Sequence, residues 1–414
     1  MVALVLSYLA LVFIVASAVS RGQGFWVFVA GALALCAVLP AFRRGRRRPL
    51  YALWLAALIA AVLGLALEAL LHLAPGVLSG HVANVAYTGY HWQRGGIYEL
   101  DDHAGPLMLP GVRRSMYWAG HWWEHDANTD GYRGPAVARA DAAFLGDSMV
   151  YGHGVGPDET LPAHFASRTG QAVANLGQQG TCQVQSWLRL ERIGLRLRPA
   201  IVFASSHFTD VGEATQWYPP EELERFLASP LESPYRPLAR EEYRPPPPWD
   251  PVSFWARHVS LPLRCGGISG AVVRALRGRA PGAGSSAAGY WRRPSSAEIE
   301  TPFTAASPDA APADALGWRV HVRAIRQVKR LCDGAGARLV LFDLGYPHGF
   351  SRAVEALAAE LGVEYSPAGR AALDRALAGR PVYLVDDGHW TSEGNDIVAA
   401  ELARSLGRQP PGGG

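Results

Sequence analysis

The sequence predicts an α/β domain with a parallel sheet, preceded by three transmembrane helices. Two observations lead to this prediction. The first part of the chain is almost wholly apolar, and the part after Ala142 alternates short apolar runs with helical patterns. Strands that alternate with helices are typical of a parallel sheet covered by helices on both faces, which makes a three-layer sandwich.

The apolar stretches at the start of the chain are Val2–Ser20, Phe25–Phe42 and Tyr51–Leu71. Helical stretches of about 18 to 21 residues extend roughly 27 to 31 Å, which covers the hydrocarbon core of a bilayer. A cleaved signal peptide would have a basic segment before a shorter apolar run, and the first stretch has neither. The sequence therefore predicts a membrane domain over residues 1–73, with the lipid bilayer as its partner.

Five arginines between positions 43 and 48 indicate how this membrane domain is oriented. Short loops rich in Lys and Arg stay in the cytoplasm. The loop between the second and third stretches is then cytoplasmic, as is the N-terminus. We therefore expect an inner-membrane protein whose large domain is extracytoplasmic, in the periplasm or at the cell surface. Because these arginines alone account for the formal net charge of +3, no nucleic-acid partner is expected.

Behind the membrane domain, residues 74–140 are expected to form a linker with short leading strands, and residues 141–408 the α/β domain. From about residue 212 to residue 315 the composition changes, with a proline run at Pro245–Pro248. Long segments of this kind are usually loops that shape access to a site. We interpret this segment as an insertion outside the domain core.

The elements of the α/β domain are predicted from apolar runs and helical periods. The expected strands are Ala142–Leu145, Ala172–Leu176, Ala200–Ala204, Arg338–Leu344 and Val382–Val385. The expected helices are Thr160–Thr169, Gln183–Leu197, Trp318–Leu331, Ala353–Leu361 and Glu393–Leu406.

Neither a metal nor a cofactor is predicted. His121, His125 and Asp126 have a spacing that suits zinc only on a helix, and the segment has no helical period, so packed and surface histidines are the better interpretation. Outside the apolar start of the chain the cysteines are Cys182, Cys265 and Cys332, which lack metal-ligand spacing. Their state stays open between one disulfide and free thiols.

Polar residues follow the expected strands at the edge where open α/β sheets place their sites. Gly146-Asp147-Ser148 follows the first strand, and Asp386 and His389 follow the last. A serine hydroxyl becomes a nucleophile when an imidazole takes its proton, and the imidazole needs an acceptor on its other nitrogen. We expect Ser148, His389 and Asp386 to form this triad, with Asp387 as the competing carboxylate.

Together these blocks resemble the SGNH, or GDSL-type, hydrolase superfamily. Gly146-Asp147-Ser148 is similar to its first block, Asn175 with Gly180 to its second, and Asp386 with His389 to its last. The resemblance implies an SGNH-type sandwich over about residues 142–406. It further implies an oxyanion hole made by Ser148, Gly180 and the third block. The run Asn128–Arg133 is similar to one found in membrane-tethered bacterial members.

The third block departs from the family pattern. The family usually has Asn-Asp there, with the asparagine amide donating to the oxyanion, whereas this chain has Thr209-Asp210. Losing one oxyanion donor can cost about 10²- to 10³-fold in rate. Thr209 is therefore a weaker candidate for the third donor, and the neighbouring His207 is an alternative.

Three hypotheses for function follow. The first is a serine ester hydrolase acting on an acyl ester, in particular an acetyl ester of a cell-envelope carbohydrate. The second keeps the acyl-enzyme but transfers the acyl group to a polysaccharide hydroxyl, in association with envelope-polysaccharide machinery. The third, which Thr209 supports, is a non-catalytic binding module. Free acetate as the sole product would exclude transfer, and failure of a serine-directed probe to label Ser148 would favour the third.

Overall fold

The computed structural model describes residues 97–101, 104–118, 121–229, 294–305, 312–384 and 387–406. The three predicted transmembrane stretches, the arginine cluster, the proline run and Asp386 lie outside these ranges. Across the residues that are described, none of the helices combines the length and apolar character that a membrane span requires.

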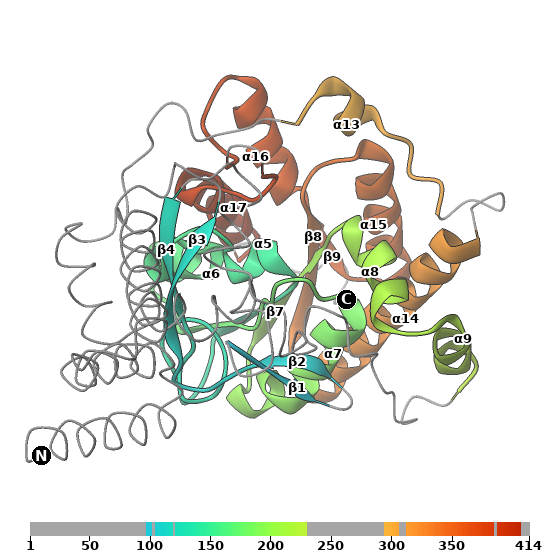
Figure 1. The fold of residues 1–414 in the computed structure, drawn as a ribbon, viewed down its shortest axis with the longest axis horizontal. Helices are drawn as coiled ribbons and strands as arrows, with labels where there is room; N and C mark the ends of the chain where they lie inside the picture. Colours follow the sequence, from blue (N-terminus) through green and yellow to red (C-terminus); the bar gives the residue numbers. More distant parts are fainter. Residues whose placement is uncertain are drawn as a thin grey trace, which may run out of the picture. The chain divides into compact units, whose positions relative to one another are not determined.

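The described part of the chain contains a five-stranded parallel sheet with the strand order β6-β5-β7-β8-β9 (Figure 1). Its strands are β5 (Ala142–Leu145), β6 (Val173–Asn175), β7 (Ile201–Ser206), β8 (Arg338–Asp343) and β9 (Glu364–Ser366). The predicted α/β class with a parallel sheet is confirmed.

Helices cover both faces of this sheet. Successive residues of a strand point to opposite faces, so each strand contributes apolar side chains to both cores. Phe144 and Phe203 pack on one face, and Ala143 and Val202 on the other. The first face is covered by α6 (Leu161–Thr169), α16 (Ala368–Leu377) and α17 (Ser392–Ser405). The second is covered by α7 (Gln183–Arg192), α8 (Thr209–Trp217), α14 (Pro312–Ala335) and α15 (His348–Leu361).

Two antiparallel hairpins precede the sheet in the chain. One pairs β1 (Tyr98–Asp101) with β2 (Gly105–Met108), and the other pairs β3 (Arg113–Trp118) with β4 (His121–Asp126). Tyr98 and Trp123 are buried in the same core cluster as the second face of the sheet. The leading strands are thus part of the folded domain, where they reach the surroundings of the candidate site.

The start of the predicted insertion differs from the prediction. Residues 209–228 form α8 and α9 (Pro220–Ala228), whose Trp217 and Phe226 are buried in the core. These helices pack on α14, which begins before the expected Trp318. Gly317 suggests a helix end, but a Cβ at that position would lie 2.1 Å from the carbonyl oxygen of Val211. The glycine is needed for close contact between α14 and α8, so the helix continues through it.

The last predicted strand is also corrected. In the described part of that run, Val382–Leu384 is not a strand of the parallel sheet: Tyr383 and Trp390 form an isolated antiparallel bridge. The run pairs with the residues that follow it because the chain turns back at once, and Leu384 N donates to His389 O at 2.8 Å. The fifth strand is β9, which is too short and too polar to show as an apolar run.

Among the cysteines, Cys182 and Cys332 are buried free thiols. Two further helices are short: α5 (Ser148–Tyr151) and α13 (Ser296–Glu300).

Candidate active site

Ser148 begins α5 directly after β5, at the carboxyl edge of the sheet. Asp147 caps this helix, since its Oδ1 accepts a hydrogen bond from Met149 N at 3.0 Å. The turn requires a glycine at position 146, because a Cβ there would lie 2.6 Å from Val150 Cγ2. At Gly177 a Cβ would lie 2.3 Å from the backbone nitrogen of Tyr151. Two glycines thus let both turns approach the short helix that presents the serine.

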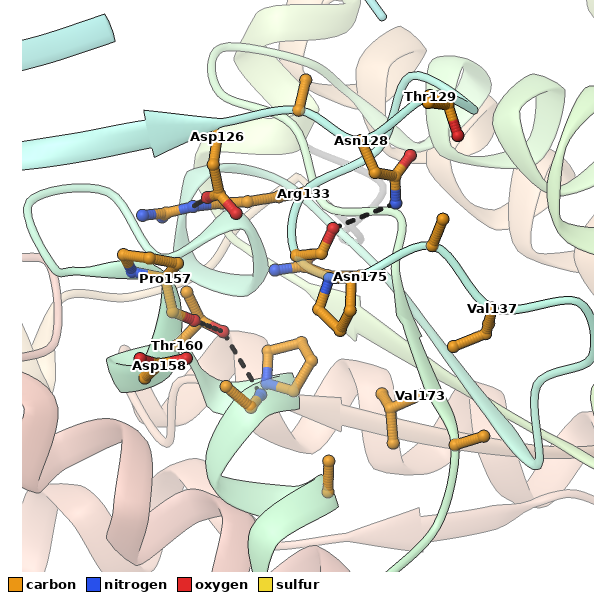
Figure 2. A pocket seen from close by; sticks show the side chains of 18 of the residues that line it. Asp126, Asn128, Thr129, Arg133, Val137, Pro157, Asp158, Thr160, Val173 and Asn175 are labelled. Atoms are coloured by element: carbon orange, nitrogen blue, oxygen red, sulfur yellow. Dashed lines mark hydrogen bonds and ion pairs between the residues drawn. The ribbon is translucent and has the colours of Figure 1, made fainter. Parts of the chain in front are cut away.

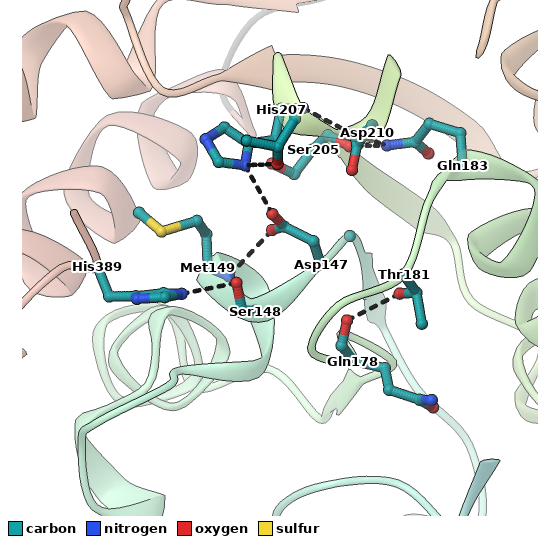
Figure 3. A network of polar contacts seen from close by, with 12 residues as sticks. Asp147, Ser148, Met149, Gln178, Thr181, Gln183, Ser205, His207, Asp210 and His389 are labelled. Carbon is teal, nitrogen blue, oxygen red and sulfur yellow. Dashed lines mark hydrogen bonds and ion pairs between the residues drawn. The ribbon is translucent and has the colours of Figure 1, made fainter. Parts of the chain in front are cut away.

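His389 brings its imidazole to this serine from the other end of the chain. Its Nε2 lies 2.7 Å from Ser148 Oγ, which is the distance a general base needs (Figure 3). The His389 side chain is 21% exposed, so solvent and small molecules can reach it. The two residues predicted to act as nucleophile and base are therefore in contact.

The second nitrogen of His389 faces a carboxylate. Nδ1 lies 2.5 Å from Asp387 Oδ1, so Asp387 is the residue that orients the imidazole in this structure. Asp386, which the family spacing favoured, lies outside the described residues. The serine, the imidazole and the Asp387 carboxylate form one continuous hydrogen-bonded chain.

Burial and the neighbouring carboxylates act in opposite directions on the pKa of His389. Burial lowers the pKa of His389, but the charge and hydrogen bond of Asp387, together with the charge of Asp147, outweigh burial and raise the pKa above its ordinary value. Nearby carboxylates favour the imidazolium that forms when the serine proton is taken. The electrostatics of the site therefore support proton transfer from Ser148.

Asp147 belongs to a second polar network beside the serine. Its Oδ2 lies 2.9 Å from His207 Nδ1, and Thr209 Oγ1 lies 2.7 Å from the same nitrogen. Burial raises the pKa of Asp147, but the charge and hydrogen bond of His207 dominate and hold it below its usual value. Figure 3 shows the Asp147 carboxylate between the His207 ring and the turn that carries Ser148. Thr209 and His207, the two candidates for the third oxyanion donor, thus contact each other.

Asp210 supports this network from behind. Its Oδ2 accepts hydrogen bonds from His207 N at 2.8 Å and from Gln183 Nε2 at 2.9 Å. Burial, with the negative charges of Asp147 and Glu213, raises the pKa of Asp210 well above its ordinary value. The second residue of the Thr209-Asp210 pair therefore orders the loop after β7.

The turn after β6 carries the second oxyanion candidate, Gly180. Asn175 shapes this turn, since its Oδ1 accepts from Gly177 N at 3.0 Å and its Nδ2 donates to Tyr151 O at 3.3 Å. Gly180 has a φ of 60°, and its carbonyl oxygen accepts from Trp217 Nε1 at 2.7 Å. The asparagine of the second block is thus a link between the two turns.

Two buried arginines bind the backbone on either side of the serine. Arg189 donates to Gly146 O and Leu176 O, both at 2.9 Å. Burial lowers the pKa of Arg189 to about 10, so its guanidinium stays charged at neutral pH. Arg189 therefore ties α7 to the turns before Ser148 and after β6.

Arg133 binds the backbone that follows the serine. It donates to Tyr151 O at 2.9 Å, Gly152 O at 2.5 Å and Val155 O at 2.6 Å. Its guanidinium also lies 4.6 Å from the centre of the Tyr151 ring. Arg133 ends the run Asn128–Arg133, which is similar to one in membrane-tethered bacterial members of the family that the sequence resembles. In the structure this arginine fixes the loop after α5.

His153, on that loop, lies against the base. The centres of the His153 and His389 rings are 4.5 Å apart. Gln179 Nε2 lies 2.7 Å from His153 Nδ1, and Gln179 Oε1 accepts a hydrogen bond from the Tyr98 hydroxyl. In the sequence, the position of His153 five residues after the serine predicts only a structural or substrate-facing residue.

His125 and Asp126, considered above as zinc ligands, have other partners. His125 Nδ1 lies 2.6 Å from the hydroxyl of Tyr151, and Asp126 Oδ1 lies 3.3 Å from Arg133 Nε. The pair lies on strand β4, where neighbouring side chains point to opposite faces. The helical spacing that zinc would need is therefore absent from this strand.

A cavity of about 750 Å³ lies beyond Arg133 (Figure 2). The described residues that line it come from the start of β3, the end of β4 and the turn after it, the segment around the start of α6, and β6. They do not include Ser148 or His389. Arg133 and Asn175 line the cavity and also hydrogen-bond to the loop after α5. The cavity is separate from the serine and the imidazole.

The fold and this site together define a class. A serine at a strand-to-helix turn, an imidazole 2.7 Å away and a carboxylate behind it make the arrangement that serine hydrolases use.

Solved structures similar to this chain include esterases and lipases. A G-D-S-L family lipolytic protein from Desulfitobacterium hafniense is 11% identical, with 64% of this chain and 97% of that chain covered and a TM-score of 0.34. An acetylxylan esterase from Geobacillus stearothermophilus is 11% identical, with 66% of this chain and 97% of that chain covered and a TM-score of 0.33. A lipase/acylhydrolase from Enterococcus faecalis is 12% identical, with 66% of this chain and 98% of that chain covered and a TM-score of 0.30.

No protein-family model matches the chain, and no curated protein does.

Proposed function

We propose that the chain is a membrane-anchored serine ester hydrolase whose catalytic domain is extracytoplasmic. The observation that carries the proposal is the 2.7 Å contact between His389 Nε2 and Ser148 Oγ, with Asp387 on the other side of the ring. The predicted membrane spans and the arginine cluster support the anchor and its orientation.

The reaction proceeds through an acyl-enzyme. Ser148 Oγ attacks the ester carbon while His389 Nε2 takes the hydroxyl proton, and the Asp387 carboxylate stabilises the imidazolium. The carbonyl oxygen becomes an oxyanion, for which we propose the backbone N–H groups of Ser148 and Gly180 as donors. Collapse breaks the ester bond, and the alcohol leaves with the proton from His389. A water molecule, deprotonated by His389, then releases the acid and restores Ser148.

The substrate we propose is an acyl ester, in particular an acetyl ester of a cell-envelope carbohydrate. An enzyme held at the outer face of the inner membrane meets envelope polysaccharides there, and the partly exposed side chain of His389 is consistent with access from the surface.

The test is hydrolysis by the purified full chain in detergent, beside Ser148→Ala. We expect release of p-nitrophenol from p-nitrophenyl acetate and of free acetate from acetylated oligosaccharides, with a loss of at least about 10³-fold in Ser148→Ala. A fluorophosphonate probe should label Ser148. Acetylated oligosaccharide acceptors as the product would establish transfer instead, and a folded chain that neither reacts nor is labelled would favour a binding module.

A further inference from the structure

His153, Asp387 and His389 form a cluster that the proposed reaction uses only in part. One donor atom from each of the three residues lies within 4.8 Å of the other two. The cluster joins the loop after α5 to the loop before α17, so its members are far apart in the chain. Two imidazoles and one carboxylate make a ligand set that zinc takes in proteins.

The spacing of these donors suits a tetrahedral ion after small side-chain movements. Zinc bonds of about 2.0 to 2.2 Å place tetrahedral ligands about 3.3 to 3.6 Å apart. The Nδ1 of His389 and Oδ1 of Asp387, now 2.5 Å apart, would separate by about 1 Å when zinc replaces the shared proton. The donors at the 4.8 Å limit would approach by a similar amount.

Gln179 supplies the second partner that a metal-bound histidine needs. When Nε2 of a histidine binds a metal, its Nδ1 carries a proton and donates it to an acceptor. Gln179 now presents its Nε2 to His153 Nδ1 at 2.7 Å and its Oε1 to the Tyr98 hydroxyl. Rotating the amide by half a turn exchanges the two atoms, so Oε1 accepts from His153 and Nε2 donates to Tyr98 oxygen. Gln179 therefore keeps a hydrogen bond to His153 and one to Tyr98 after the rotation.

The site is open to an ion from solution. The Asp387 and His389 side chains are 12% and 21% exposed, while His153 is buried behind them. Water would supply the fourth ligand, because the Ser148 hydroxyl lies on the Nε2 side of the His389 ring and the zinc on the Nδ1 side. With zinc on Nδ1, the neutral imidazole of His389 carries its proton on Nε2, the nitrogen that faces Ser148. That nitrogen then cannot take the serine proton.

We propose that His153, Asp387 and His389 bind one zinc ion, and that the bound ion inhibits the enzyme reversibly. Zinc binding rests on geometry alone, whereas inhibition rests on the proposed function. The two parts are therefore measured separately.

Binding is measured on the full chain in detergent with the Ser148→Ala substitution, after removal of metals with a chelator. Competition of ZnCl₂ against a chromophoric chelator should give one zinc per chain that is sensitive to the cluster. Adding His153→Phe should weaken this site at least about 100-fold, and Gln179→Leu about 10- to 100-fold. Magnesium should not compete, since it prefers oxygen ligands.

The matched control is His164→Phe, which removes a half-buried histidine that contacts Ser392 on another part of the domain. It should leave zinc affinity unchanged. His153→Asn replaces the phenylalanine variant if that variant does not fold, as judged by circular dichroism. Equal zinc affinity with and without His153 would overturn the site, as would an equal loss in His164→Phe.

Inhibition is measured on the chain with Ser148 intact. Zinc should abolish esterase activity at the concentration that saturates the site, and chelator should restore it. Each variant is compared with its own metal-free rate, and His153→Phe should need at least about 100-fold more zinc. Zinc that binds at the cluster without slowing hydrolysis would overturn the inhibitory role. A chain without esterase activity would refute the proposed function while the binding experiment still decided the site.

Discussion

The Ser148–His389 and Ser206–His321 pairs show how much depends on what lies behind an imidazole. In the first pair the Nε2–Oγ distance is 2.7 Å, and in the second it is 3.1 Å. Behind His389 lies the Asp387 carboxylate, whereas His321 stacks on Trp318 with ring centres 5.3 Å apart. The same two residue types are in contact in both regions, but their surroundings differ.

This difference decides the charge of each ring. Burial lowers the pKa of His321 to about 3, so that ring is neutral at physiological pH. His389 also feels burial, but Asp387 and Asp147 raise its pKa above the ordinary value. A neutral ring locked in an apolar core links two elements, while a ring beside carboxylates can accept and return a proton.

The two serines differ as well. Ser206 is the last residue of β7 and is fully buried, so its hydroxyl only joins the strand to α14. Ser148 stands at a glycine turn with its hydroxyl beside an accessible imidazole. Contact between serine and histidine is therefore insufficient for catalysis. The turn, the carboxylate and access to solvent make the difference.

Replacing the carboxylate should make the first pair resemble the second. We expect Asp387→Asn to lower kcat on p-nitrophenyl acetate by about 10³- to 10⁴-fold, because the amide no longer stabilises the imidazolium. Asp386→Asn, the matched control, should lose less than about 10-fold. A larger loss in Asp386→Asn than in Asp387→Asn would show that Asp386 is the orienting acid.

The turn at Ser148, unlike the strand end at Ser206, depends on a buried arginine. Arg133→Met removes the donors to four backbone carbonyl groups and the ion pair with Asp126. The free energy of unfolding should fall by about 3 to 5 kcal/mol in denaturant titrations. Arg113→Met, at an exposed position beside the same cavity, should change it by less than about 0.5 kcal/mol. Equal losses of stability in Arg133→Met and Arg113→Met would contradict this role of Arg133.

The neutral ring of His321 should make the fold sensitive to acid. Its folded-state pKa of about 3 lies below the ordinary value of 6.5, so the unfolded chain binds the proton more readily. Its stabilising contribution is complete above pH 6.5 and is lost as the pH falls from there towards 3. At pH 5 it should amount to a loss of about 2 kcal/mol relative to pH 7. His321→Phe should remove this part of the slope of unfolding free energy against pH. An unchanged slope in His321→Phe would show that His321 does not contribute to the acid sensitivity of the fold.

The smallest effect is expected at Thr209. Its Oγ1 lies 2.7 Å from His207 Nδ1, which also contacts Asp147, so the side chain packs into the network around Asp147. Thr209→Ala should lower kcat by less than about 10-fold, compared with the 10²- to 10³-fold typical of an oxyanion donor. A loss above 100-fold would identify Thr209 as that donor.

Much of this architecture is predictable because it is encoded locally. Apolar runs such as Ala142–Leu145 mark strands, and the glycine at 146 marks a sharp turn whatever the rest of the chain does. The order of the blocks also pointed to Ser148 and His389 as partners. The three transmembrane helices and the role of Asp386 stay predictions, since these residues lie outside those described.

Other features depended on the tertiary structure. The family spacing favoured Asp386 over its neighbour, and only the folded structure shows Asp387 on His389. Arg133 and His153 show no local pattern, because their partners come from distant segments. By itself, then, the sequence determined the periodic elements and the turn at Ser148, since these follow from backbone geometry and neighbouring residues. Packing alone decided which distant side chains meet, because such contacts depend on the whole fold.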